Sequence, residues 1–158
     1  MAEKKKKIEK LNPVFEIFHL KQIKNEKDVS HLKTTTVNMP DVAADFLYPE
    51  IGNEDREILC VLCLNVKNEI IAFHRCHVGS LNASIIHPRE IYKTAILNNA
   101  SSIIIAHNHP SGNTAPSSED IDVTKRIEHA GDILGIPLLD HLIIGDNQFL
   151  SLNEKGFL

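Results

Sequence analysis

SSIIIAHNHPSG, residues 101–112, is the stretch of sequence on which the predicted fold depends. Its first half is an apolar, β-branched run of the length expected for a buried strand. Side chains two apart on a strand share a face, so His107 and His109 are expected to project together from the strand end. Pro110 and Gly112 then end the strand and begin a loop.

A helix start follows this loop. Ser117 or Ser118 is the expected N-cap, with Glu119 and Asp120 in the first turn. Two imidazoles at a strand end and a carboxylate from the next helix can form a three-ligand metal site with one position left for water, as in catalytic zinc sites. The alternative is that the histidines are ordinary polar residues and Asp120 is a capping acid.

The spacing of these residues matches a family pattern. It reads His-x-His, seven residues, Ser, two residues, Asp, with Pro-Ser-Gly directly after the second histidine. This resembles the JAMM/MPN+ zinc metalloprotease motif, and HNHPSG resembles its bacterial RadC branch. Residues 79–82 (GSLN), 87–90 (HPRE) and 139–145 (LDHLIIG) also resemble RadC, so the resemblance covers residues 35–158.

The resemblance implies a cytidine-deaminase-like JAMM/MPN fold and one Zn²⁺ per chain, held by His107, His109 and Asp120. It also implies an upstream glutamate that is not a ligand and that moves the proton of the attacking water. Glu57 fits, because it precedes the apolar run 58–64 and lies 50 residues ahead of His107. Glu54 and Glu90 are the alternatives, although the helix dipole already explains an acid at Glu90.

Ser117 matches the serine of the motif, whose implied role is to hold the oxyanion of the reaction. Its alternative role is that of N-cap. Asn108 is expected on the opposite strand face from the two histidines. The resemblance implies that it is not a ligand, because most family members outside the RadC branch have Ser or Thr at this position. Asp140 and His141 could either orient a metal ligand or simply pair with each other.

Composition places the chain among globular proteins of one domain, with 158 residues, 42% hydrophobic and 24% charged. No apolar run approaches the roughly 20 residues of a membrane helix, and the lysine-rich start lacks a secretory apolar region. We therefore expect a cytoplasmic protein without membrane association. Cys60, Cys63 and Cys76 are expected to be buried free thiols, because Cys60 and Cys63 would face opposite sides of a strand and could not share a ligand.

Charge divides the chain into two parts. Residues 1–33 carry nine lysines against five acids, which leaves eight basic against sixteen acidic residues for the remainder and a net charge of −4. We therefore expect a basic N-terminal extension (1–34) and an acidic domain (35–158). The acidic balance does not support nucleic acid as a partner of that domain. Nothing in the extension resembles the helix-hairpin-helix module often found in the family, and the run 4–7 is expected to be a solvated tail or, alternatively, a nucleic-acid arm.

Periodicity and turn residues predict an α/β fold, a mixed central β-sheet sandwiched by helices. The expected helices begin near Met39, at His87 and near Ser117. The expected strands are 56–66, 69–78, 80–86, 101–106, 142–144 and 148–152, with weaker signals at 13–23 and 31–37.

These features favour a zinc-dependent hydrolase of amide bonds, peptide or isopeptide, acting on a peptide or protein substrate. One alternative is a protein of the RadC type that processes or binds nucleic acid in DNA repair. Another is a non-catalytic MPN interaction module. The sequence does not indicate an oligomeric state.

Overall fold

The structure is a computed structural model that describes residues 35–79 and 86–158. The predicted extension 1–34, the predicted strand at 13–23 and nearly all of the one at 80–86 lie outside the described residues. Of the predicted strand at 31–37, the described part forms an isolated bridge between Thr36 and Glu69. No helix among the described residues is long and apolar enough to cross a membrane.

Five strands form one mixed sheet in the order β2-β1-β3-β4-β5. They are β1 (Ile58–Leu64), β2 (Ile70–Val78), β3 (Ser102–Asn108), β4 (Leu138–Ile144) and β5 (Phe149–Ser151). β3 and β4 run parallel, joined by a helical crossover, and the other neighbours are antiparallel.

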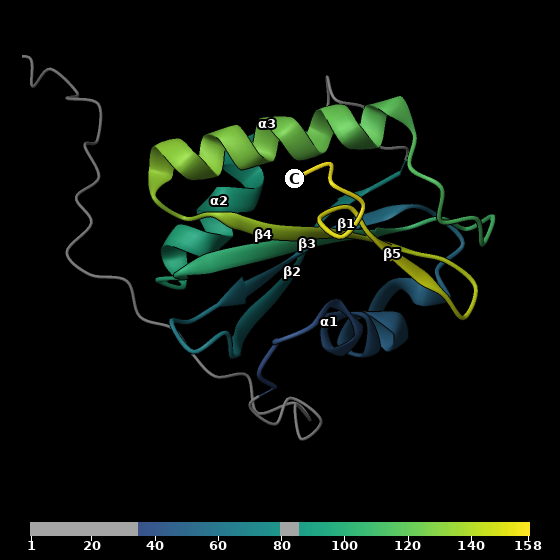
Figure 1. Cartoon of the computed structure of the whole chain (residues 1–158), viewed down its shortest axis with the longest axis horizontal. Helices are drawn as coiled ribbons and strands as arrows, with labels where there is room; N and C mark the ends of the chain where they lie inside the picture. Colours follow the sequence, from purple (N-terminus) through teal and green to yellow (C-terminus); the bar gives the residue numbers. More distant parts are fainter. Residues whose placement is uncertain (1–34, 80–85) are drawn as a thin grey trace, which may run out of the picture.

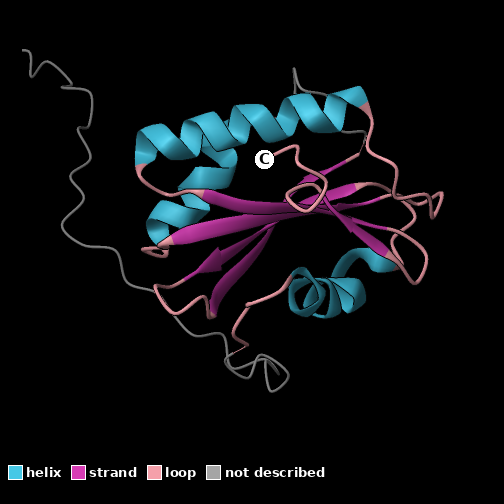
Figure 2. Ribbon diagram, viewed as in Figure 1, coloured by secondary structure: helices cyan, strands magenta, loops and turns pink. Residues whose placement is uncertain are grey.

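Helices cover both faces of this sheet (Figures 1 and 2). α1 (Pro40–Leu47), with a π-helical turn η1 (Tyr48–Gly52), lies on one face, and α2 (Pro88–Leu97) and α3 (Ser118–Leu134) lie on the other. The prediction of an α/β fold with a mixed sheet between helices is therefore confirmed.

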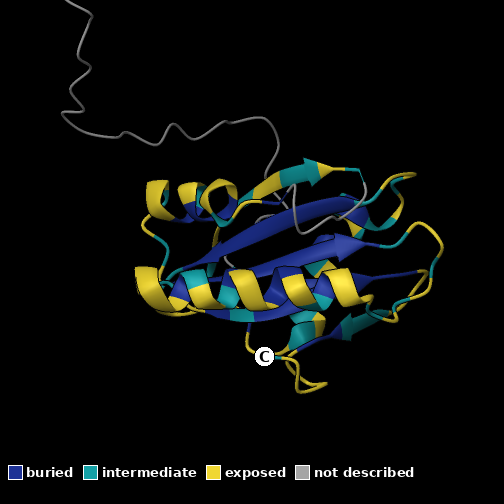
Figure 3. Cartoon of the chain, turned by 90° about the horizontal axis from the view of Figure 1, so that it is seen from above, coloured by how far each residue is buried: buried dark blue, intermediate teal, exposed yellow. Residues whose placement is uncertain are grey.

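The central strands β1 and β3 are buried at every residue, because helices cover both of their faces (Figure 3). Alternate side chains enter two cores. Cys60, Leu62 and Ile104 pack with α1, whereas Leu59 and Ile105 pack with α2 and α3. The strand that carries the histidines is therefore held rigidly up to its last residue pair.

The helix boundaries follow the predicted signals. α1 and α2 begin with a proline in the first turn. Ser117 caps α3, and Gly135 ends it in the left-handed conformation at φ 69°. Asn68, with φ 58°, makes the predicted turn between β1 and β2.

The start of β4 differs from the prediction, because the strand begins at Leu138 and not at Leu142. Asp140 and His141 interrupt the apolar pattern, yet both are buried inside the strand. Their polar atoms are satisfied by internal hydrogen bonds, which a local pattern cannot reveal.

The cysteines are free, as predicted, but only two of them are buried. Cys60 and Cys63 lie on opposite faces of β1, each in a different core. Cys76 is half-buried on β2, an edge strand whose neighbour in the five-stranded sheet is β1. Burial raises the pKa of Cys63 to about 11, so this thiol is an inert core group.

Candidate metal centre

The end of β3 presents two imidazoles on one sheet face. His107 is fully buried near the end of β3, and the His109 side chain, one residue beyond the strand, is 15% exposed. The His109 backbone N–H still donates to Ile144 O at 2.9 Å, so the chain stays anchored to β4 before it turns into the loop. The predicted projection of both side chains from the strand end is confirmed.

Asp120 from the first turn of α3 completes a three-residue cluster. His107 Nε2 lies 2.9 Å from His109 Nε2 and 3.2 Å from Asp120 Oδ1, and His109 Nε2 lies 3.6 Å from Asp120 Oδ2. One ligand atom from each residue falls within 4.8 Å of the others. The structure thus brings together the three residues that the sequence singled out.

The hydrogen bonds around the cluster fix which atoms can bind a metal. His109 Nδ1 donates to Asn113 O at 2.6 Å, because a carbonyl can only accept. His107 Nδ1 is engaged with His141 Nε2 at 2.8 Å. Burial, and then the proximity of His109, lowers the pKa of His107 to about 3, so its imidazole is neutral.

Chemically, this donor set fits a divalent cation. Two imidazole nitrogens and two carboxylate oxygens converge, and the ring protons on the Nδ1 side are used outside the cluster. Lone pairs that face one another in this way repel unless a cation lies among them. Neutral imidazole and carboxylate are the ligands of catalytic zinc sites, with a position open for water.

Asp120 is also part of the capping box of its own helix, as the third residue after the N-cap Ser117. Its Oδ2 accepts from Ser117 N at 2.8 Å and from Ser117 Oγ at 2.7 Å, while its backbone N–H donates to Ser117 Oγ at 3.1 Å. This capping box holds the carboxylate rigidly with Oδ1 toward His107. Capping and metal binding, weighed as alternatives in the sequence, are compatible in the structure.

Glu57 lies immediately before β1, half-buried. Leu59 pairs with His107, and the antiparallel register continued by two residues places Glu57 opposite His109. The hydrogen bond from Gly79 N to Glu57 O at 2.8 Å belongs to the neighbouring β1–β2 ladder and keeps Glu57 in line with β1, two residues before Leu59. Opposite residues share a face, so Glu57 belongs to the sheet face that carries both histidines.

The two alternatives to Glu57 are placed differently. Glu54 forms an ion pair with Arg75 at 2.8 Å and lines a cavity beside His109. Glu90 is exposed in the first turn of α2, where it contacts Arg89 at 3.1 Å.

Asn108 points to the opposite face, as predicted, and clamps the segment that carries Glu57. Its Oδ1 accepts from Ile58 N at 2.7 Å, and its Nδ2 donates to Arg56 O at 3.0 Å and to Glu54 O at 3.3 Å. Both sides of Glu57 are therefore tied to the residue between the two histidines.

Asp140 and His141 do not pair through their side chains. Asp140 accepts from the His141 backbone N–H, from Ser151 Oγ and from Asn153 N, all within 3.1 Å, and so joins β4 to the C-terminal segment. His141 points to the other face and contacts His107. Thr124, which contacts His141 at 2.6 Å, was not identified from the sequence; its position one helical turn after Asp120 was the available signal.

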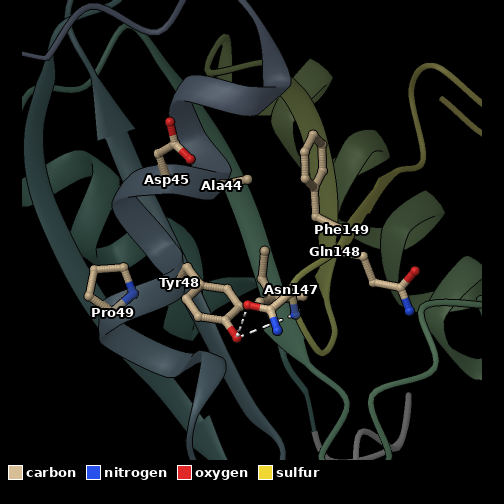
Figure 4. A pocket seen from close by; sticks show the side chains of 8 residues that line it. Ala44, Asp45, Tyr48, Pro49, Asn147, Gln148 and Phe149 are labelled. Atoms are coloured by element: carbon tan, nitrogen blue, oxygen red, sulfur yellow. Dashed lines mark hydrogen bonds between the residues drawn. The ribbon is translucent and has the colours of Figure 1, made fainter.

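Two cavities lie near the end of the sheet that carries the cluster. The one beside His109, of about 270 Å³, is lined by Glu54, the loop 109–112 and Asp146. A larger groove of about 420 Å³ runs between α1 and the β4–β5 hairpin. Tyr48 lines both cavities, and Figure 4 shows its hydroxyl hydrogen-bonded to Asn147, which lines the larger groove.

Comparison with known proteins identifies the family. Residues 37–157 match the family model of the RadC-like JAB domain. UPF0758 proteins of Caldanaerobacter subterraneus and Desulfitobacterium hafniense are 52% and 50% identical over 122 residues, which is 77% of this chain and 52% and 54% of theirs. A UPF0758 protein of Bacillus licheniformis is 49% identical over the same length.

The chain therefore spans about half the length of these curated relatives. The family match covers the described sheet, its helices and the cluster of His107, His109 and Asp120. It agrees with the JAB/MPN-type fold implied by the resemblance in the sequence. On this evidence the chain belongs to the RadC-like JAB domain family.

Proposed function

We propose that this protein is a zinc-dependent hydrolase of amide bonds, in peptides or isopeptides. The observation that carries the proposal is the convergence of His107 Nε2, His109 Nε2 and Asp120 Oδ1 with both Nδ1 atoms bonded elsewhere. These residues would hold one zinc ion. When bound, zinc would act as a Lewis acid that lowers the pKa of water, so that the water can lose a proton and attack a carbonyl at neutral pH.

Glu57 is the proposed general acid and base. It shares the sheet face of the two histidines, and Asn108 fixes the backbone on both of its sides. Its carboxylate would take a proton from the attacking water and return it to the amine that leaves. An amide needs this second transfer, since the departing nitrogen is a poor leaving group until it is protonated.

Ser117 is the proposed donor to the oxyanion. In the structure its hydroxyl proton points to Asp120 Oδ2 at 2.7 Å, so the donor is positioned at the edge of the cluster. Rotation about one side-chain bond would redirect this proton to the oxygen that develops negative charge. A substrate would approach through the cavity beside His109, whose lining includes the polar residues Glu54, Ser111 and Asp146.

The test is hydrolysis of a peptide and isopeptide library by the full chain, with Glu57→Gln as the critical variant. We expect zinc-dependent cleavage by the wild type, lost on chelation and restored by zinc. Glu57→Gln should keep its zinc and lose cleavage by 10²–10⁴-fold, the usual contribution of a general acid or base.

Glu90→Gln is the matched control, because Glu90 is exposed on α2 and pairs only with its neighbour Arg89 in the described structure. It should cleave like the wild type. Unchanged cleavage in Glu57→Gln would refute the assigned mechanism, and a loss in Glu54→Gln alone would transfer the role to Glu54.

A further inference from the structure

A continuous chain of hydrogen bonds links two of the metal-site residues through the protein interior. Thr124 Oγ1 bonds to Asp120 O at 2.7 Å and to His141 Nδ1 at 2.6 Å, and His141 Nε2 bonds to His107 Nδ1 at 2.8 Å. Thr124, His141 and His107 are fully buried, and Asp120 is 2% exposed. The chain thus runs from α3 through β4 to β3 without access to water.

The direction of every bond in this chain follows from its first member. Asp120 O is a carbonyl and can only accept, so the single hydroxyl proton of Thr124 points to it. Thr124 Oγ1 must then accept from His141 Nδ1–H. A neutral His141 has its lone pair on Nε2, which accepts from His107 Nδ1–H.

We propose that Thr124 and His141 are positioning residues that keep the proton of His107 on Nδ1 and its Nε2 lone pair facing the metal position. The inference rests on the proposed metal site and adds two residues to it. His109 obtains the same tautomer from a simpler partner, the carbonyl of Asn113.

A carbonyl oxygen can only accept a hydrogen bond, whereas an imidazole nitrogen donates or accepts according to the tautomer. The tautomer of His141 must therefore be fixed before His141 can fix that of His107. If His141 carried its proton on Nε2, it would donate to His107 Nδ1 and drive the His107 proton onto Nε2, where it blocks metal binding. Thr124 prevents this, since its only proton is committed to Asp120 O. The same bonds tie α3, which carries Asp120, to β3, which carries His107.

The direct test is the tautomeric state of the histidines in the metal-free wild-type chain, measured from ¹⁵N chemical shifts and long-range ¹⁵N–¹H correlations. We expect protonated Nδ1 and unprotonated Nε2 for both His107 and His141. A proton on Nε2 of either ring would overturn the proposal, whatever the enzyme does. This readout needs neither metal nor substrate, so its failure is distinct from failure of the proposed hydrolase activity.

Matched pairs of variants test the consequence for zinc affinity, measured by competition with a chromophoric chelator. Thr124→Val removes the acceptor, and Thr124→Ser restores it. His141→Leu breaks the chain, and His141→Gln can maintain it, because an amide both donates and accepts. We expect about 10–100-fold weaker zinc binding for Thr124→Val and His141→Leu, the usual cost of losing a partner of a metal ligand. Thr124→Ser and His141→Gln should bind zinc almost as tightly as the wild type.

Ser151→Ala is the control for general damage to β4. The Ser151 hydroxyl is also buried and donates to Asp140 Oδ2 at 2.6 Å, on the strand face opposite His141. It should lower stability without changing zinc affinity. Equal zinc affinity in Thr124→Val and Thr124→Ser, or equal losses in Thr124→Val and Ser151→Ala, would contradict the proposal.

Discussion

The Asn108 side chain accepts a hydrogen bond from the backbone N–H of Ile58 at 2.7 Å, across 50 residues of sequence. Through this contact Asn108, which lies between the two histidines, supports the segment that precedes β1 and carries Glu57. The metal-site strand and the proposed general base are therefore held by one buried side chain.

Replacing Asn108 by alanine should cost about 1–3 kcal/mol of unfolding free energy, because the Ile58 N–H is left buried without its partner. It should also lower cleavage more than zinc content, since Glu57 loses its support while His107 and His109 remain. Urea unfolding, metal analysis and the cleavage assay measure the three effects. The control is Asn98→Ala at the C-terminal end of α2, which removes the hydrogen bond from Asn98 Nδ2 to Thr94 O at 2.8 Å. A similar loss of cleavage there would contradict this role.

Ser117→Ala separates the two roles of this hydroxyl. Loss of the cap should cost about 1 kcal/mol of stability. Loss of an oxyanion donor should reduce kcat by about 10²–10³-fold. The neighbour Ser118, whose hydroxyl contacts only the exposed Glu119 among the described residues, is the control. A kcat for Ser117→Ala equal to that of Ser118→Ala would leave Ser117 with its capping role alone.

Gly145→Ala should disturb the loop that carries Asn113, the partner of His109. An added Cβ would meet Gly112 O and would lie 2.6 Å from Thr114 Cγ2. The loop would have to move, so we expect weaker zinc binding together with lower stability. Gly156→Ala is the comparison, because its Cβ meets nothing within 4 Å and only its φ of 76° is strained. Unchanged zinc affinity in Gly145→Ala would show that the loop position does not matter.

Acid should destabilise the metal-free protein. Burial lowers the pKa of His107 to about 3 and that of His141 well below its ordinary 6.5. Below pH 6.5 the unfolded chain binds protons that the folded chain does not, so stability falls as the pH decreases, by up to about 1.4 kcal/mol per pH unit for each histidine.

The variant His141→Gln removes one of these two groups. Its unfolding free energy, measured in urea between pH 6.5 and 4, should therefore fall less steeply than that of the wild type. Parallel slopes for the two proteins would mean that His141 is not buried in its neutral form.

Local rules predicted most of the cluster, and the spacing of the family motif selected Asp120 over its neighbours Glu119 and Asp122. The spacing of two on a strand put His107 and His109 on one face, and the cap at Ser117 put Asp120 in the first turn of α3. The parallel order of β3 and β4 then brought the helix back over that strand end. Only this return of α3 over the end of β3 depends on tertiary structure, and the predicted α/β fold implied it.

The supporting residues could not be predicted in the same way. His141 lies in β4, 34 residues from His107, and the register of two parallel strands decides that their rings meet. Asp140 and His141 also hid the true start of β4 at Leu138. Polar residues in a sequence predict a loop unless their buried hydrogen-bond partners are known. Asn108 was placed on the correct face, but its partner Ile58 belongs to another strand.

Metal content tests the central claim most directly. Elemental analysis of the purified full chain should give about one zinc per wild-type molecule and none in the double variant His107→Ala, His109→Ala, as expected for a single three-ligand site. Circular dichroism of the double variant checks that it remains folded. No metal in the wild type, even after dialysis against zinc, or equal zinc in a folded double variant, would contradict the assignment of His107, His109 and Asp120 as a metal site.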